Sequence, residues 1–404
     1  MFLAQIGEVA VGASGNAILF YYMIIASLSG LAVASQIIIG RRNGERNFHK
    51  TGAIFKQSVL FTAVTATLAW ILVFFFAKDF IELIYSSEAV SEVTTTYLEM
   101  RSFGIWPALV SFCFIGFFVG TTNTRPIAIA AILLAIVNVL FDYLLIFGIG
   151  VFPAMGVEGA ALASVIAEVS GALFLIGYTL KFVDLKKYGL NLKFKFDAEI
   201  MARIWVIGRP IMLQYLIAMG GWSVFFSIIE HLGERPLAVS HIVRAIYMVI
   251  GIPLIAWADA SNTLVSNLIG KNKRSQIMPT IWKIAKMLLA VNLVFILLIN
   301  GFAAQIISLF TADLSLIADT IPVLRVISFS TTFFAIGMLF YRSLAGAGMT
   351  ALCMRIEMFT IICYLLLSFT LVDGFHASTA LVWCTEFLYF GLLGGLSYYY
   401  LNKG

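Results

Sequence analysis

Eleven long apolar runs constrain this sequence more than any other feature. A helix needs about 20 mostly apolar residues to cross the hydrocarbon core of a bilayer, and no soluble fold has an interior that could hide eleven such runs. Only 12% of the 404 residues are charged, about half the share of a typical soluble domain. The sequence therefore predicts an all-α integral membrane protein. The predicted spans are residues 16–40, 53–77, 96–120, 127–150, 159–182, 204–229, 241–268, 280–302, 321–344, 351–372 and 378–400.

The sequence lacks the motifs that are typical of several functional classes. The sequence contains no Walker A motif, no dinucleotide-binding glycine fingerprint and no HExxH motif. Its four cysteines lie inside apolar runs and form no CxxC pair, as expected of small buried side chains. The net charge of +5 comes from Lys and Arg in short loops between apolar runs, which does not suggest nucleic-acid binding. We expect a protein that is not an enzyme and holds no cofactor or metal.

Basic residues concentrate in every second loop. The loops at 41–52, 183–203 and 269–279 are rich in Lys and Arg, whereas the fourth, eighth and tenth loops hold none. Cytoplasmic loops carry this excess, so we predict that the odd-numbered loops and the C-terminus are cytoplasmic and that the protein lies in the inner (plasma) membrane. Eleven spans would then place the N-terminus outside, yet Met1–Ala13 shows no signal segment. We therefore expect a missing first helix, with twelve spans in the intact protein.

The chain also shows a twofold internal repeat. Gly40 and Gly270 each end a span, Arg101 and Arg325 each lie in a span, and Gly120 and Gly346 each close one, with separations of 230, 224 and 226 residues. We predict an N-terminal bundle at 1–182, a cytoplasmic loop at 183–203 and a C-terminal bundle at 204–404. Transporters built from parallel repeats bind substrate between the bundles near the bilayer midplane.

Three motifs resemble those of the multidrug and toxic compound extrusion (MATE) family. They are Gly-Thr-Thr-Asn-Thr-Arg-Pro at 120–126, Asn-Val-Leu-Phe-Asp-Tyr at 138–143 and Gly-Val-Glu-Gly-Ala-Ala at 156–161. The runs at 36–44 and 266–270 resemble the ends of the second family helix and of its repeat. The resemblance covers the whole chain except the absent start. It implies two pseudo-symmetric six-helix bundles around a central cavity, and export of small organic, often cationic compounds in exchange for Na⁺ or H⁺. The acidic residue that family members often carry in the first helix is not in this sequence.

Acidic residues inside the spans indicate a functional or structural role, because a charge at the bilayer centre costs about 2.5–3.5 kcal/mol even on insertion scales. Asp142 and Asn138 are four residues apart and share a helix face. Together with Glu168 on the next span, they are our candidates for cation coupling. The alternative is a structural hydrogen bond between helices.

Asp259, Glu386 and Glu230 are our candidates for contact with a cationic substrate. For Glu230, near the end of its helix beside His231, a solvated helix end is the leading alternative. Glu99 and Arg101 lie near the outer face, where we expect mutual pairing or snorkelling.

These features predict a monomeric secondary active exporter of small organic cations, driven by Na⁺ or H⁺ through alternating access. One alternative is a flippase for a lipid-linked saccharide precursor, and another is an inactive truncated remnant. A membrane enzyme acting on lipids is less favoured, because the sequence has no DDxxD or His-rich cluster.

Overall fold

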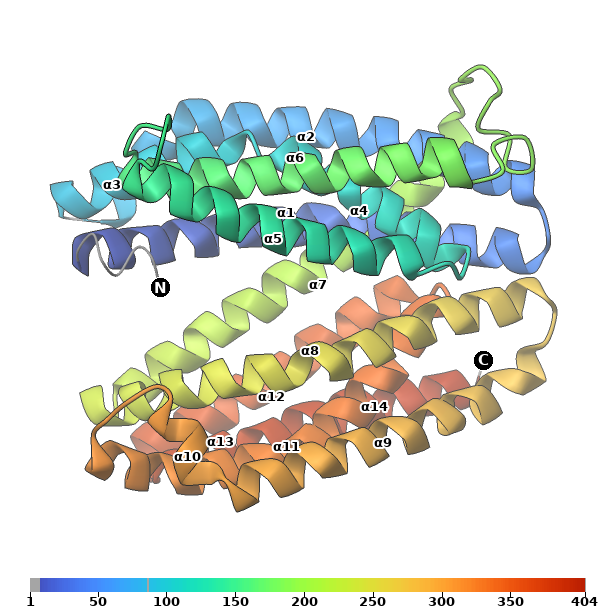
Figure 1. The fold of residues 1–404 in the computed structure, drawn as a ribbon. Coiled ribbons are helices and arrows are strands. Elements are labelled where there is room, and N and C mark those ends of the chain that lie inside the picture. Colours follow the sequence, from blue (N-terminus) through green and yellow to red (C-terminus); the bar gives the residue numbers. More distant parts are fainter. Residues whose placement is uncertain (1–7, 86, 404) are drawn as a thin grey trace. The chain divides into compact units, whose positions relative to one another are not determined.

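The chain folds into helices throughout its regular structure, as seen in a computed structural model that describes residues 8–85 and 87–403 (Figure 1). In these residues, ten helices are long and apolar enough to cross a membrane, and one bent pair of helices makes an eleventh span if counted together. The predicted all-α membrane fold and its eleven spans are thereby confirmed. Most of the N-terminal segment in which no signal sequence was found lies outside the described residues.

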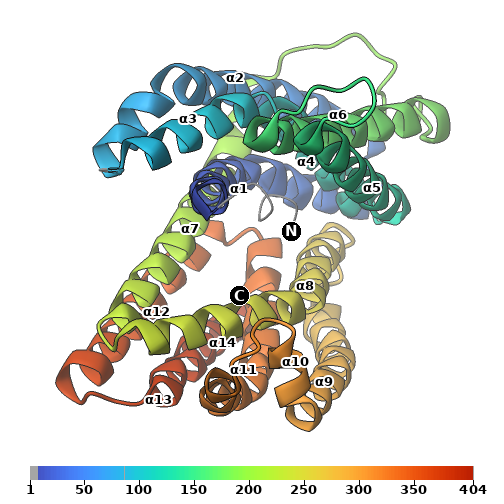
Figure 2. The ribbon, with the colours of Figure 1, turned by 60° about the vertical axis from the view of Figure 1, so that its left-hand side comes forward.

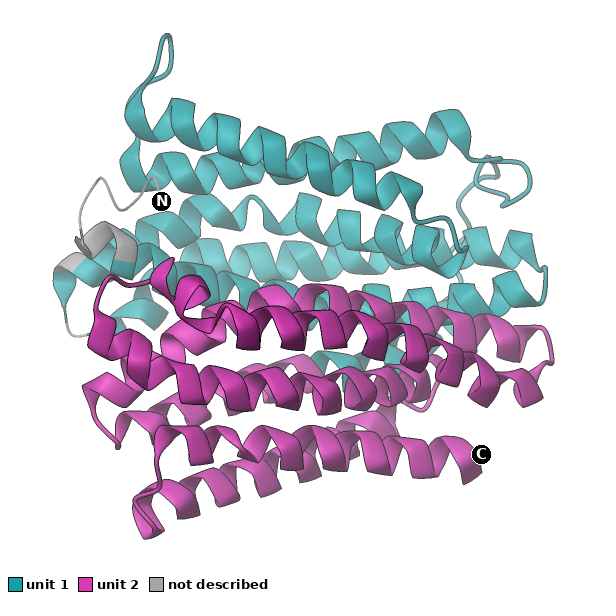
Figure 3. Cartoon of the chain, turned by 60° about the horizontal axis from the view of Figure 1, so that its bottom comes forward, with its two compact units in different colours: residues 1–212 teal, residues 213–404 magenta. Residues whose placement is uncertain are grey.

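The chain divides into two compact units, residues 1–212 and 213–404 (Figure 3). The predicted inter-lobe loop at 183–203 lies within unit 1 and ends nine residues before this division (212 minus 203). The predicted domain boundaries stay a prediction. The helices of unit 1 are α1 (Glu8–Gly44), α2 (Phe48–Ile84), α3 (Glu88–Ser102), α4 (Ile105–Gly120), α5 (Arg125–Phe147), α6 (Gly156–Phe182) and the first part of α7 (Ala198–Glu230). Unit 2 holds the rest of α7, α8 (Glu234–Gly270), the short helix η2 (Arg274–Gln276), α9 (Ile277–Gly301), α10 (Ala303–Ser308), α11 (Leu314–Gly346), α12 (Thr350–Phe369), the π-helical η3 (Thr370–Gly374), α13 (Thr379–Trp383) and α14 (Thr385–Lys403).

Several helices are longer than a bilayer requires. The helices α1, α2 and α8 each contain 37 residues, which corresponds to about 55 Å at 1.5 Å per residue. The hydrocarbon core is only about 30 Å thick. These helices therefore extend beyond the hydrocarbon, and the basic residues Arg41 and Arg42 in the last turn of α1 fall in such an extension.

The predicted span at 96–120 is broken into α3 and α4, which meet at an angle of 50°. The break follows from the sequence: Pro107 has no N–H to donate to the carbonyl of Phe103, so a continuous helix would lose that hydrogen bond. Gly104 stands at the break, before the first residue of α4. A proline inside a spanning helix predicts a kink, and the structure shows that near Pro107 one helix ends and another starts.

The same close packing recurs in both units. In unit 1, α1 packs on α4, and a Cβ atom on Gly116 would lie 2.9 Å from the carbonyl oxygen of Ala32. In unit 2, α8 packs on α11, and a Cβ on Gly346 would lie 2.1 Å from the carbonyl oxygen of Asn262. Gly116 and Gly346 are 230 residues apart (346 minus 116), and so are Ala32 and Asn262 (262 minus 32). Gly40 and Gly270 have the same separation. The structural partner of Gly346 is therefore Gly116, one helical turn before the Gly120 that the sequence comparison selected.

Each unit has one central helix. In unit 1, α1 contacts α2, α3 and α4, while α5 lies along α6; in unit 2, α11 contacts α8, α9 and α14 (Figures 1 and 2). Mostly apolar side chains fill both cores. Among the described residues, the buried polar side chains are Ser, Thr, Asn and Gln together with two carboxylates, Glu357 and Glu386. Buried polar groups need hydrogen-bond partners, and the two carboxylates need them most.

Candidate functional site

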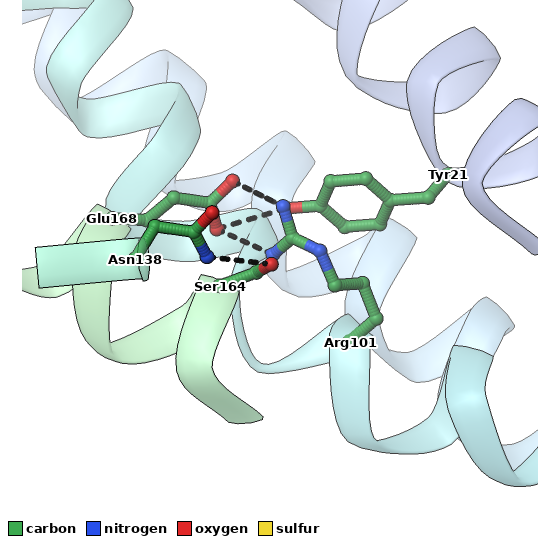
Figure 4. A network of polar contacts seen from close by, with 5 residues as sticks. All are labelled: Tyr21, Arg101, Asn138, Ser164 and Glu168. Carbon is green, nitrogen blue, oxygen red and sulfur yellow. Dashed lines mark hydrogen bonds and ion pairs between the residues drawn. The ribbon is translucent and has the colours of Figure 1, made fainter. Parts of the chain in front are cut away.

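A buried ion pair lies in unit 1, where α3 ends (Figure 4). The guanidinium of Arg101 binds both carboxylate oxygens of Glu168, with Nη1–Oε2 at 2.7 Å and Nη2–Oε1 at 2.6 Å. The hydroxyl of Tyr21 donates to the same carboxylate at 3.2–3.3 Å, and its ring lies 3.9 Å below the guanidinium carbon. The side chains of Arg101 and Glu168 are only 11% and 14% exposed, so water screens this pair little.

The helix break makes room for this ion pair. Gly104 has no side chain, and a Cβ there would lie 2.3 Å from both Arg101 Nη1 and Glu168 Oε2. Glu168 therefore lies against the N-terminal end of α4, where free N–H groups favour a negative charge. The expected pairing of Arg101 with Glu99 is wrong, because the break turns Arg101 toward α6. Tyr21 and Arg101 were missed as site residues; the glycine and proline in the middle of a span were the signal that could have found them.

A cavity of about 410 Å³ adjoins the ion pair within unit 1. Its walls are mostly apolar and aromatic, from α1, α3, α4, α5 and α6, and its polar lining includes Tyr21, Arg101, Ser164 and Glu168. This combination of an apolar wall and a few fixed polar groups is typical of a small-molecule site.

The three predicted cation-coupling residues are only partly brought together. Asn138 donates through Nδ2 to Ser164 Oγ at 3.2 Å, and Ser164 stands one turn before Glu168 on α6 (Figure 4). Asp142 lies one turn further along α5 and is half-buried. Among the described residues it has no hydrogen-bond or ion-pair partner. Its role in coupling stays a prediction.

In unit 2, Asp259 of α8 forms an ion pair with Arg342 of α11, at 3.1 Å between Oδ1 and Nε. The Arg342 side chain is 12% exposed and that of Asp259 is 48% exposed. Asp259 is thus accessible, but its charge is already matched within the protein. Glu230 is the exposed last residue of α7, next to the surface pair of His231 and Asp373, whose Nδ1 and Oδ1 atoms are 3.1 Å apart.

Glu386 lies in the core of unit 2 and is 1% exposed. The hydroxyl of Tyr364 donates to its Oε1 at 3.0 Å and the hydroxyl of Tyr247 to its Oε2 at 3.3 Å. A second buried acid, Glu357 on α12, accepts a hydrogen bond from Tyr389. Glu357 was missed by the sequence reasoning, although an acid in the middle of an apolar run was the available signal. The substrate contacts predicted for Asp259, Glu386 and Glu230 stay predictions.

The described residues contain no cluster of three or more His, Cys, Asp or Glu side chains that could hold a metal ion.

Comparison with known proteins shows which protein family this chain resembles. The model of the family MatE matches residues 1–144 and 210–370, more than half of the chain. The probable multidrug resistance protein YoeA of Bacillus subtilis is 22% identical over 76% of this chain and 67% of its own length. The FAD transporter of Shewanella oneidensis is 24% identical over 77% of this chain and 69% of its own length. A probable multidrug resistance protein NorM, from Agrobacterium fabrum, is 24% identical over 58% of this chain and 51% of its own length. The chain thus spans about half to two thirds of the curated relatives it matches.

Solved structures show the same fold over the whole chain. A crystal structure of MATE in the straight conformation superposes with a TM-score of 0.91 at 20% identity, covering 100% of this chain and 89% of that one. A MOP superfamily transporter from Pyrococcus furiosus, described as having a binding pocket of reverse polarity, superposes with a TM-score of 0.90 at 20% identity, with the same coverage. At this level of identity the likeness establishes the architecture.

Proposed function

The chain belongs to the MatE family, and from this premise we propose that it is a secondary active exporter of small organic, mainly cationic compounds, driven by exchange for Na⁺ or H⁺. Two of the relatives above are named as probable multidrug resistance proteins, which supports small-molecule export. We propose that it works as a monomer, without a cofactor and without enzymatic activity.

The observation that carries this proposal is the polar constellation around the cavity of unit 1. Charged groups inside membrane spans are costly and mark ion or substrate pathways. Here the Arg101–Glu168 pair and the Asn138–Ser164 hydrogen bond are placed on α3, α5 and α6. The cavity beside them has the aromatic walls that suit a flat organic cation.

Asp142 is the best candidate for the coupling ion among the three predicted residues. Glu168 already has Arg101 as its ion-pair partner, at 2.6–2.7 Å, so its carboxylate does not need a cation from solution. Asp142 has no such partner among the described residues, and it is half-buried. An ion drives transport only if it binds one conformation more tightly than the other, and a carboxylate without a fixed countercharge can meet this requirement.

The test is dye efflux from proteoliposomes under imposed Na⁺ or H⁺ gradients, made with the full-length gene product. We expect one of the gradients to drive efflux, and Asp142→Asn to abolish that dependence. Glu158→Gln, an exposed acid at the start of α6, is the control and should behave as the wild type. If neither gradient drives the wild-type protein, the exporter proposal is wrong, and the flippase or inactive-remnant alternatives take its place.

We also propose that the protein lies in the inner (plasma) membrane with its C-terminus in the cytoplasm. The alternation of basic loops supports this orientation. A green fluorescent protein fused after the last residue should fluoresce, because it folds in the cytoplasm, whereas alkaline phosphatase fused there should be inactive. The opposite pair of results would reverse the orientation.

A further inference from the structure

Each unit has a glutamate on its last complete spanning helix, and this glutamate accepts a hydrogen bond from a tyrosine hydroxyl. In unit 1, Glu168 of α6 accepts from Tyr21 of α1. In unit 2, Glu386 of α14 accepts from Tyr247 of α8. At the 230-residue separation set by the close contacts at Ala32 and Asn262, Tyr21 matches Gly251, and Tyr247 lies one turn before it. The two sites are therefore similar in composition but not at equivalent positions.

The two sites differ in what balances the carboxylate. Glu168 has the guanidinium of Arg101. Arg325, which the sequence comparison matched to Arg101, is exposed. Among the described residues no Lys, Arg or His lies within ion-pair distance of Glu386, and its second hydrogen-bond donor is the neutral hydroxyl of Tyr364.

The titratable groups on the surrounding helices do not supply the missing charge. The nearest cation on α11, Arg342, is paired with Asp259 at 3.1 Å and faces Glu357 rather than Glu386. The short helix α13 carries no titratable side chain. The titratable groups around Glu386 and its neighbour Glu357 are Tyr247 on α8, Tyr341 and Arg342 on α11, Glu357 and Tyr364 on α12, and Tyr389 on α14.

A carboxylate that is 1% exposed and lacks a countercharge is strongly disfavoured, and binding a proton removes that cost. The two tyrosine donors act in the opposite direction, because a hydrogen bond to the ionised carboxylate stabilises it. The site is therefore balanced between its neutral and charged forms. A sodium ion is less suited to it, since a hard cation needs several free oxygen ligands and both carboxylate oxygens here already accept hydrogen bonds.

The backbone beside Glu386 is irregular. The residue stands in the first turn of α14, directly after the break that separates α14 from α13. The preceding span ends in the π-helical η3, a feature often found at functional sites. The hydroxyls of Thr385 and Ser368, 3.2 Å apart, continue the polar groups from Glu386 toward α12. A break in a spanning helix gives a buried acid a place where water can reach it when the helices move.

We propose that Glu386 is a proton-exchange site in unit 2, separate from Asp142, which holds a proton when enclosed and releases it when water reaches the break between α13 and α14. The binding step adds H⁺ to one carboxylate oxygen, and the release step returns it to water. Its use in transport rests on the proposed function, whereas the protonation itself does not.

The first experiment is infrared spectroscopy of the full chain in liposomes as the pH is changed. A protonated carboxylic acid has a carbonyl stretching band that a carboxylate lacks. We expect the wild type to show such a band that disappears as the pH rises, because burial without a countercharge favours the protonated acid. Glu386→Gln should lose this component. Glu158→Gln, which replaces an exposed acid at the start of α6, is the control and should keep it.

Two results would overturn the proposal. A band that is unchanged in Glu386→Gln would show that Glu386 carries no proton, and a band that persists at all pH values would show that the proton does not exchange. Tyr364→Phe keeps the acid and removes one donor to its charged form, so its band should persist to higher pH than that of the wild type. This shift separates a titrating acid from a packing defect.

Transport assays then separate this proposal from the proposed function. If the wild-type protein exports dye, Glu386→Gln should flatten the pH dependence of the initial rate while Glu158→Gln leaves it intact. If the wild-type protein exports nothing but the infrared band titrates, the exporter proposal fails and the proton site stands. If dye is exported and the band does not titrate, the proton site fails and the exporter proposal stands.

Discussion

Replacing Glu168 by glutamine should destabilise unit 1 strongly. The substitution leaves the Arg101 guanidinium in a site where the side chains are only 11–14% exposed, and an arginine cannot lose its charge. Removing one partner of a buried ion pair costs about 3–5 kcal/mol. The contact of Arg101 with the Tyr21 ring, at 3.9 Å, remains in the variant and offsets only a small part of this cost, about 1–2 kcal/mol for a desolvated pair.

Thermal unfolding in detergent can measure this effect. Cys113 is buried in α4, so a variant in which it is the only cysteine should react with a thiol-specific dye only when unit 1 unfolds. For a domain of about 200 residues, 1 kcal/mol shifts the Tm by about 2–4 °C. The expected loss in Glu168→Gln is therefore on the order of 10 °C.

The reverse substitution, Arg101→Met, is the informative control. It leaves Glu168 as the unpaired group, but a glutamate can take up a proton and become neutral. The loss of Tm should therefore be smaller than in Glu168→Gln and should shrink further as pH falls, whereas the loss in Glu168→Gln should not depend on pH. The double variant should recover much of the loss. Equal, pH-independent losses in the two single variants that simply add in the double variant would refute the reasoning.

Three further predictions concern single positions. Gly346→Ala should lower the Tm of unit 2, because its Cβ would lie 2.1 Å from the backbone oxygen of Asn262. Overpacking of this kind costs about 1–3 kcal/mol. Gly395→Ala is the control and should leave the Tm unchanged, because the space around its Cβ is open. Gly104→Ala should separate the Arg101–Glu168 pair, since its Cβ would lie 2.3 Å from both partners, and should lower the Tm in the same Cys113 assay. Asp313 caps α11, and hydrogen bonds, chiefly from Ser315, lower the pKa of its carboxyl. A carboxyl whose pKa is lower in the folded than in the unfolded state stabilises the fold at pH values above its unfolded pKa, and this stabilisation is lost as the pH falls through its folded pKa. Asp313→Ala should therefore speed hydrogen exchange in the first turn of α11 at pH 7 and make no difference at acidic pH.

The number and position of the spans could be predicted from the sequence because the bilayer imposes a length on every apolar run. The break between α3 and α4 was predictable only as a kink, since whether a proline bends or ends a helix depends on what packs beside it. Gly104 decides this here: the Arg101–Glu168 pair fills the space that a side chain would occupy.

The candidate site was predicted less completely, because a sequence shows which spans carry charges but not which faces meet. Glu168 was predicted to take part in cation coupling, which stays a prediction, and it lines the cavity of unit 1. Its partner Arg101 was assigned to the membrane surface. Asn138 and Asp142 were expected to act as one face, and only Asn138 has a partner among the described residues. The tyrosines that bond Glu168 and Glu386 carry no charge and could not be told from the many other aromatic residues.

The internal repeat and the charges, taken together, suggest different roles for the two units. Both units have a glutamate that accepts a hydrogen bond from a tyrosine, but the other groups around the two carboxylates differ. Arg101 gives Glu168 an ion-pair partner within the protein. Tyr364 leaves Glu386 without a countercharge, so that its charge can respond to the exposure of the site. A carboxylate with a permanent countercharge gains less from binding a proton than one without. From the proposals above we therefore expect coupling to fall to Asp142 rather than Glu168 in unit 1, and to Glu386 in unit 2.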